Sequence, residues 1–170
     1  MSVGVKVFVA VFLMREGKVL LLRRARDKAF APGRWTGVGG QVEVDEMGDL
    51  AGAALREVYE ETDLGPHEVR DLRLRVVLTQ PEAGQVVVLA FFTGRTDRED
   101  VGPCDEGQLH WIDIGAVGSL DMIGNARQAL DLAVREVEAN REGVFFGVCD
   151  PDEQDGFRSM TLGPDSFLIG

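Results

Sequence analysis

Apolar residues gather in short runs separated by polar turns, a pattern that predicts a strand-rich domain. The runs are rich in Val, Leu and Phe and cover residues 5–14, 19–23, 72–80, 85–94 and 109–114. The turns at 15–18 and 81–84 each contain glycine, which favours hairpins between the flanking strands. A further hairpin is expected near the C-terminus, with strands at 144–148 and 158–162.

Two segments instead show helical spacing. Residues 125–140 repeat apolar side chains at helical intervals, and residues 50–62 follow Asp49, a residue type that caps helix N-termini. Strands around two helices predict an α/β fold in which helices sandwich a mixed β-sheet. The chain of 170 residues fits one domain spanning 1–170.

The composition is that of a globular protein, with 45% hydrophobic and 28% charged residues. A net charge of −11 argues against a nucleic-acid polymer as partner, because such proteins carry a basic surface. Nucleotides stay compatible, since a metal ion can bridge carboxylates and phosphates. Residues 3–14 are apolar but too short to cross a membrane and do not resemble a secretion signal. Cys104 and Cys149 give no disulfide framework, so we expect a cytoplasmic protein without a membrane partner.

The helix expected at 50–62 carries the candidate chemistry. Glu57, Glu60 and Glu61 stand at positions i, i+3 and i+4 and therefore share one face. An ordinary acidic surface is one interpretation, although such a surface normally intersperses its carboxylates with Lys or Arg. A site for Mg2+ or Mn2+ is the other, because these ions prefer oxygen ligands. The preceding Gly39-Gly40 pair favours the metal site, since glycine lets the backbone approach an ion closely.

A glycine turn, a loop and a helix with Arg-Glu and Glu-Glu pairs resemble the Nudix box. That family's pattern is G, five residues, E, seven residues and R-E-U-x-E-E-x-G-U, where U is bulky and apolar. The positions that match by type are Gly40, Glu46, Arg56, Glu57, Val58, Glu60, Glu61 and Leu64. The resemblance implies a Nudix-type α/β/α sandwich with a mixed β-sheet. It also implies metal ions on Glu57, Glu60, Glu61 and the carbonyl of Gly39 or Gly40, with Arg56 orienting the glutamates.

Two positions depart from the family pattern. Nine residues rather than seven separate Glu46 from Arg56. If Asp49 caps the helix, the added pair lies in the loop before it, so the carboxylates keep their register and the role of Glu46 is left open. Asp63 stands where the family has glycine near the helix end, a position that often needs a left-handed backbone, which Asp tolerates.

Further candidates lie outside the helix. In MutT-type members a loop glutamate reaches the metal site, and Glu106, in the sequence DEGQ, stands in such a loop. Arg23 ends the second strand and is either solvated or a phosphate ligand, because arginine binds phosphate through paired donors. For Arg24 and Arg26 we favour solvation. Trp35 fits the core or the wall of the pocket beside the helix.

Most of the chain also resembles the human-type oxidised-purine nucleoside triphosphate hydrolases. The segments that carry this resemblance are FAPGRWTGVGGQV, LHWIDIGAVGSLDM and VFFGVCDPDEQDGFRSMTL. The positions aligned with base-reading residues differ, because Thr36 replaces an Asn, Ile123 a Trp, and Asn125 with Ala126 an Asp pair. We expect these positions to line the base pocket and to discriminate poorly between oxidised and normal purines.

The resemblance implies a metal-dependent hydrolase of a nucleoside diphosphate linked to another group X. A nucleoside triphosphate, giving the monophosphate and pyrophosphate, is the first candidate substrate, and ADP-ribose or another nucleotide sugar is the alternative. The expected catalytic residues are Arg56, Glu57, Glu60 and Glu106, and the general base is a box glutamate or Glu106. A module that senses a nucleotide without hydrolysing it is the alternative from another class, but Arg56 and the three glutamates are all present, which favours catalysis. The oligomeric state is left open.

Overall fold

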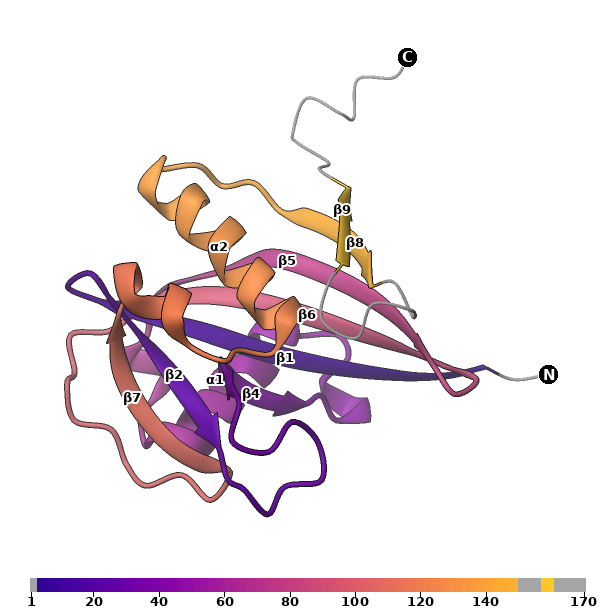
Figure 1. Ribbon diagram of the computed structural model, residues 1–170, viewed down its shortest axis with the longest axis horizontal. Coiled ribbons are helices and arrows are strands. Elements are labelled where there is room, and N and C mark those ends of the chain that lie inside the picture. The colour runs from indigo at the N-terminus through magenta and orange to yellow at the C-terminus, as the bar shows by residue number, and fades with distance from the viewer. Residues whose placement is uncertain (1–2, 150–156, 161–170) are drawn as a thin grey trace.

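In a computed structural model of the protein, one mixed β-sheet lies between two helices (Figure 1). The structure describes residues 3–149 and, for the backbone, 157–160. The strands are β1 (Gly4–Arg15), β2 (Lys18–Arg24), β3 (Trp35–Thr36), β4 (Val38–Gln41), β5 (Arg70–Glu82), β6 (Gln85–Arg95), β7 (Gly107–Asp113), β8 (Phe145–Cys149) and β9 (Phe157–Met160). The helices are α1 (Leu50–Thr62) and α2 (Gly124–Glu138), and short 3-10 helices lie at Val44–Glu46, Pro66–Glu68 and Ile114–Ser119.

The sheet runs in the order β3-β2-β1-β6-β5-β8-β9, with β4 also paired to β1 and β7 to β2. β1 is parallel to β6 and β5 is parallel to β8, while the other pairs are antiparallel. The predicted mixed sheet and the hairpins β1–β2 and β5–β6 are therefore confirmed. The C-terminal hairpin is present as β8–β9, and residues 161–162 of its expected second strand lie outside the described residues.

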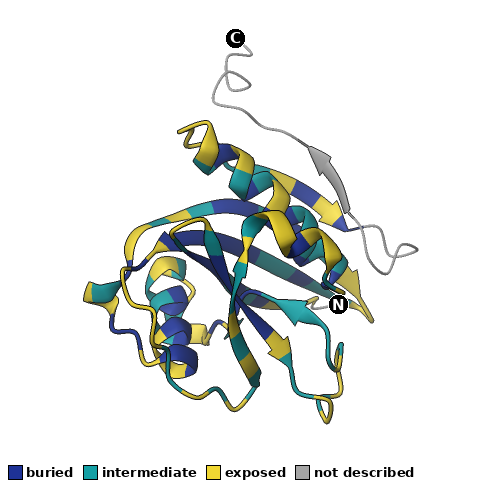
Figure 2. Ribbon diagram, turned by 60° about the vertical axis from the view of Figure 1, so that its left-hand side comes forward, coloured by how far each residue is buried: buried dark blue, intermediate teal, exposed yellow. Residues whose placement is uncertain are grey.

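The two faces of the sheet hold separate parts of the hydrophobic core, because side chains alternate between the faces along each strand. Val9 and Val11 of β1 pack with Val58 of α1 on one face. Phe12 of β1 packs with Leu130 of α2 on the other. Figure 2 shows the strands between the helices as mostly buried, and both helices turn exposed residues outward. This arrangement is the expected α/β/α sandwich. Among the described residues, no helix is long and apolar enough to span a membrane.

The limits of α1 agree with the prediction from sequence. The Asp49 carboxylate accepts a hydrogen bond from the Gly52 N–H at 2.9 Å, which caps the N-terminus. Asp63 ends the helix in a left-handed conformation, with φ of 60°, and its N–H donates to the Tyr59 carbonyl. The unusual spacing therefore lies before the helix, as expected. The other predicted ends shift slightly, since α2 covers 124–138 and residue 114 begins a 3-10 helix rather than ending β7.

Candidate active site

The acidic face of α1 lines a cleft of about 860 Å³. Glu57, Glu60 and Glu61 all reach this cleft, together with Gly39 and Gly40 of β4. The cleft continues along the inner face of β1 and β6 to the first turn of α2. The structure therefore gathers the three glutamates and the glycine pair at one cavity that is large enough for a nucleotide-sized ligand.

Arg56 is the centre of the carboxylate network. Its Nε and Nη2 donate to the two oxygens of Glu46 at 2.6 and 2.8 Å. Its Nη1 lies 2.9 Å from Glu57 Oε1 and 3.1 Å from Glu60 Oε2. One guanidinium thus fixes three carboxylates at once, because its planar fork presents several donors in set directions. The role of Glu46, open from the sequence, is that of the paired partner of Arg56.

The two glycines of β4 let the backbone pass close to these carboxylates. The Gly39 N–H donates to Glu61 Oε2 at 2.9 Å. A Cβ at Gly39 would lie 2.0 Å from the Val9 carbonyl oxygen, and one at Gly40 would lie 2.5 Å from Glu57 Oε2. No residue with a side chain fits at either position without moving its neighbours. The glycine pair therefore forms one wall of the acidic site.

Burial and mutual repulsion act on the carboxylates of this site. Glu57 is 8% exposed and Glu61 is 6% exposed. Burial raises the pKa of Glu57, against the opposing effect of Arg56. Burial raises the pKa of Glu61 to about 8, and the charges of Glu57 and Glu106 act in the same direction. A cation would relieve both effects, so the donor set of carboxylates and nearby backbone carbonyls fits a hard divalent ion.

The carboxylates are held by protein donors. Within residues 3–149 and 157–160, no three Asp, Glu, His or Cys side chains are arranged around a common metal position. The physical reason is that Arg56 engages Glu57 and Glu60 while the Gly39 N–H engages Glu61. A metal ion would have to compete with these donors or turn the side chains away from them. The assignment of Glu57, Glu60, Glu61 and Glu106 as metal ligands stays a prediction.

Glu106 lies in the loop before β7 and lines the same cleft. Its Oε1 accepts a hydrogen bond from Lys28 Nζ at 2.8 Å. This hydrogen bond is the main cause of a raised pKa at Lys28. Glu106 is close enough to Glu61 to raise its pKa. The structure therefore brings the loop glutamate to the acidic site, where a lysine pairs with it.

The positions expected to read the base lie together, and Trp35 lies apart from them. Thr36, Ile123 and Asn125 line the cleft, and so does Ala126. Trp35 does not line the cleft, because the side chains of adjacent residues on a strand point to opposite faces. The Trp35 ring packs against the α2 side of the core, with its centroid 5.3 Å from that of His110.

Arg23 also lies outside the cleft. Its guanidinium sits 5.9 Å from the centroid of the Trp35 ring, and its Nε donates to the Gly33 carbonyl at 3.4 Å. Arg24, for which solvation was favoured, lines the cleft instead. The register of β2 explains this exchange, because Leu22 and Arg24 share the face that points into the cavity. The strand period of two was the sequence signal that would have selected Arg24.

Phe30 is a cleft residue that the sequence analysis did not single out. It is 65% exposed at the cleft, in the loop between β2 and β3. Arg24 holds this loop, since its Nε donates to the Phe30 carbonyl at 2.9 Å and its guanidinium lies 5.9 Å from the Phe30 ring centroid. An exposed aromatic ring beside a cationic side chain is suited to contact a base and a phosphate.

Comparison with known proteins gives the family. Residues 4–138 match the model of the NUDIX domain. The chain is 46% identical over 72 residues to the m7GpppN-mRNA hydrolase NUDT17 of Danio rerio, a match that covers 41% of this chain and 23% of the relative. It is 45% identical over 62 residues to the human protein of that name, covering 36% and 18%. The matched segment thus spans less than a quarter of these relatives.

Solved structures share the fold. The MutT protein from Bacillus halodurans superposes with a TM-score of 0.70 at 20% identity, covering 91% of this chain and 97% of that one. A Nudix hydrolase from Nitrosomonas europaea gives a TM-score of 0.71 at 25% identity, covering 87% and 80%. The Nudix domain of NrtR from Shewanella oneidensis, complexed with ADP ribose, gives 0.63 at 17% identity, covering 81% and 90%.

The domain match covers well over half of the chain, and the fold and the arginine–glutamate network agree with it. Nudix enzymes act on nucleoside diphosphates linked to a further group and use a divalent metal ion. The chain therefore belongs to the Nudix family.

Proposed function

We propose that this chain is a Mg2+-dependent pyrophosphohydrolase whose first candidate substrate is a nucleoside triphosphate, giving the monophosphate and pyrophosphate. One observation carries the proposal: the cleft that is lined by Arg56 and its glutamate partners Glu57 and Glu60 is also lined by Thr36, Ile123 and Asn125. A nucleotide placed along the cleft would present its phosphates to α1 and its base to the start of α2.

The residues that would hold the metal are Glu57, Glu60, Glu61 and the backbone carbonyl of Gly39 or Gly40. When bound, the ion supplies charge neutralisation at the pyrophosphate and lowers the pKa of a coordinated water. Mn2+ could take the same oxygen ligands. Mg2+ is the first choice because its preferred donors are carboxylate oxygens, water and substrate phosphates.

The remaining steps fall to side chains of the cleft. Arg56 keeps the carboxylates of Glu57 and Glu60 in place, which fixes the direction from which they act. Either a box glutamate or Glu106 accepts the proton of the attacking water. Arg24 is placed to bind a phosphate of the substrate, and Phe30 to contact its base.

A second candidate substrate has a nucleoside on both sides of the phosphates. Two relatives with segments 46% and 45% identical to this chain are m7GpppN-mRNA hydrolases, and a phosphate bridge of this kind is part of that name. The net charge of −11 disfavours a long RNA attached to it. ADP-ribose is the third candidate, because the NrtR domain of the same fold binds it.

A nucleotide panel tests the proposal. The purified chain is incubated with nucleoside triphosphates, 8-oxo-dGTP, ADP-ribose and a capped dinucleotide, each with Mg2+, Mn2+ or EDTA. Phosphate and pyrophosphate release are measured, the latter after adding a pyrophosphatase. We expect metal-dependent pyrophosphate release from triphosphates, and kcat/KM for 8-oxo-dGTP within a thousandfold of dGTP, about 4 kcal/mol. Binding without turnover of any compound would instead identify a sensing module.

A further inference from the structure

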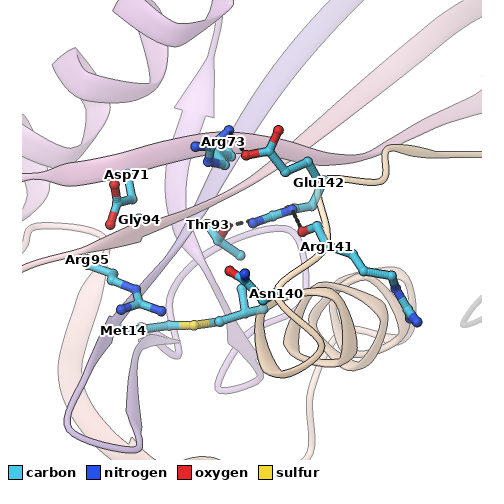
Figure 3. A pocket seen from close by; sticks show the side chains of 11 residues that line it. Met14, Asp71, Arg73, Thr93, Gly94, Arg95, Asn140, Arg141 and Glu142 are labelled. Carbon is cyan, nitrogen blue, oxygen red and sulfur yellow. Dashed lines mark hydrogen bonds and ion pairs between the residues drawn. The ribbon is translucent and has the colours of Figure 1, made fainter. Parts of the chain in front are cut away.

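A second cavity, of about 230 Å³, lies at the other end of β5 and β6 beside the end of α2 (Figure 3). It shares no lining residue with the active-site cleft. Its lining is rich in arginine, with Arg73, Arg75, Arg95 and Arg141 around one small space. In a chain of net charge −11, such a concentration of cations calls for a physical reason.

A β-bulge in β5 places Arg75 in this cavity. Leu74 pairs with Phe92 and Val76 pairs with Phe91, so Arg75 is an extra residue between two consecutive pairs. The bulge changes which face of the sheet the alternate side chains of β5 reach. Leu74 packs on the α1 side, whereas Val76 packs on the α2 side. Arg75 and Val76 are both buried as a result. The backbone irregularity thus turns an arginine into the interior below the end of α2.

Arg75 is 6% exposed, yet no carboxylate of the described residues pairs with it. Its Nε donates to Thr93 Oγ1 at 3.0 Å and its Nη1 donates to the Arg141 carbonyl at 2.9 Å. Its Nη2 has no hydrogen-bond partner in the same part of the chain. Burial, and then the charge of Arg73, lower the pKa of Arg75, and the charges of Glu136 and Glu142 oppose this shift without reversing it. A buried cation with only neutral acceptors is unfavourable unless an anion offsets it.

The nearest carboxylates, Glu136 and Glu142, act on Arg75 from a distance, and each forms its ion pair with another arginine. Arg73 pairs with Glu142 at 2.7 Å, and Arg141 pairs with the buried Glu136 at 2.7 Å. The Arg95 side chain makes no hydrogen bond or ion pair with any described residue.

When the charges in these ion pairs are set aside, the cavity lining is left with two cations, Arg75 and Arg95, and one carboxylate, Asp71. Figure 3 shows Asp71 and Arg95 on the left of the view, with Thr93 and Asn140 near its centre.

We propose that this cavity binds a phosphate-class oxyanion between Arg75 and Arg95. The guanidinium groups come from adjacent strands, and arginine presents paired donors that match the oxygens of phosphate. The Asn140 amide and the Thr93 hydroxyl add neutral polar groups at the same cavity. Free orthophosphate and pyrophosphate share this chemistry. The site is separate from the catalytic cleft, so the proposal does not depend on the substrate proposed above.

The test is an NMR titration of the ¹⁵N-labelled chain in EDTA at constant ionic strength, with sodium phosphate in one arm and sodium pyrophosphate in the other. We expect saturable shifts at residues 73–75, 93–95 and 140–142 and at the Arg75 Nε–H. The metal-free acidic cleft should not respond. If orthophosphate saturates the shifts, one phosphate group is sufficient for binding. If pyrophosphate binds at least tenfold more tightly, the cavity is a site for a diphosphate.

Three variants make the test specific. Arg95→Gln should weaken binding at least tenfold, because it removes an unpaired cation from the lining. Arg135→Gln makes the same charge change on the exposed side of α2, away from the cavity, and should leave the affinity unchanged. Asp71→Asn should tighten binding several-fold, since it removes the remaining carboxylate. Asn tolerates the left-handed backbone of that position, where φ is 52°.

Two results would overturn the proposal. The first is the absence of saturable shifts in these segments up to about 10 mM of either anion, which would leave Arg75 as an anchor for the segment after α2. The second is an equal loss for Arg95→Gln and Arg135→Gln, which would show attraction to overall charge rather than a site. Neither result requires a substitution of the buried Arg75, because the three variants change other residues.

Discussion

Arg56 and Glu46 form a two-point ion pair, with Nε–Oε1 and Nη2–Oε2 distances of 2.6 and 2.8 Å. The pair connects α1 to the 3-10 helix at Val44–Glu46. It forms although nine residues separate the two positions, because the 3-10 helix and the turn before Asp49 absorb the added length. The pair anchors the guanidinium that also holds Glu57 and Glu60.

The first prediction concerns the pH dependence of stability. Hydrogen bonds from Arg56, and then the Glu43 N–H, lower the pKa of Glu46 to about 2. A pKa below the unfolded value means that the ionised carboxylate stabilises the fold above about pH 4.5, and that this contribution is lost as pH falls toward 2. Glu46→Gln should therefore lower the free energy of unfolding near neutral pH, with a smaller difference from wild type near pH 3.

Urea unfolding of both proteins across this pH range measures the effect. Asp45→Asn is the matched control, because Asp45 is an exposed neighbour without a hydrogen bond in the described residues. A difference between Glu46→Gln and wild type that stays constant from neutral pH to about pH 3 would contradict the assigned ion pair.

The second prediction concerns the catalytic network. Glu60→Gln should cut turnover at least about a hundredfold, because an expected oxygen ligand of the metal loses its charge. Its side chain is 56% exposed, so thermal unfolding should change little. Glu138→Gln, on the exposed end of α2, is the control for charge removal. Near-wild-type rates of Glu60→Gln at saturating Mg2+ would show that Glu60 is not a metal ligand.

Local signals were sufficient to predict α1 from the sequence. Asp49 caps the helix, Asp63 ends it in a left-handed conformation, and the glutamate spacing places three carboxylates on one face. Each of these features depends on residues within one or two turns of each other. The pair of Glu46 with Arg56 was not predictable, because the intervening 3-10 helix sets the distance.

Features that depend on contacts between distant segments could not be predicted from the sequence pattern. In β5 every second residue is apolar, which predicts a single buried face along the strand. These residues are Leu72, Leu74, Val76 and Leu78. The bulge at Arg75 divides them between two faces, and only the pairing with β6 reveals it. The parallel pairing of β1 with β6 likewise depends on contacts between distant segments.

The third prediction separates two neighbouring arginines. Arg24→Gln should lower kcat/KM about tenfold or more, mainly through KM, because a hydrogen bond to a charged phosphate is worth roughly 1.5–3 kcal/mol. Arg23→Gln is the matched control, since Arg23 lies over Trp35 outside the cleft, and it should stay within about twofold of wild type. A larger loss for Arg23→Gln than for Arg24→Gln would return the phosphate contact to Arg23.

The last prediction concerns Glu106 and its partner Lys28, whose Nζ lies 2.8 Å from Glu106 Oε1. Glu106→Ala should lower kcat at least about tenfold with little loss of thermal stability, if this loop carboxylate takes part in proton transfer or metal binding. Lys28→Met separates that role from a structural one, because it removes the ion pair and leaves the carboxylate in the cleft.

We expect Lys28→Met to keep kcat within about twofold of wild type or to raise it, since Glu106 no longer has to leave an ammonium partner. Steady-state rates at several Mg2+ concentrations measure both variants. Equal losses for Lys28→Met and Glu106→Ala would show that the ion pair matters through the position of its loop. Full activity of Glu106→Ala would show that the catalytic carboxylates all come from α1.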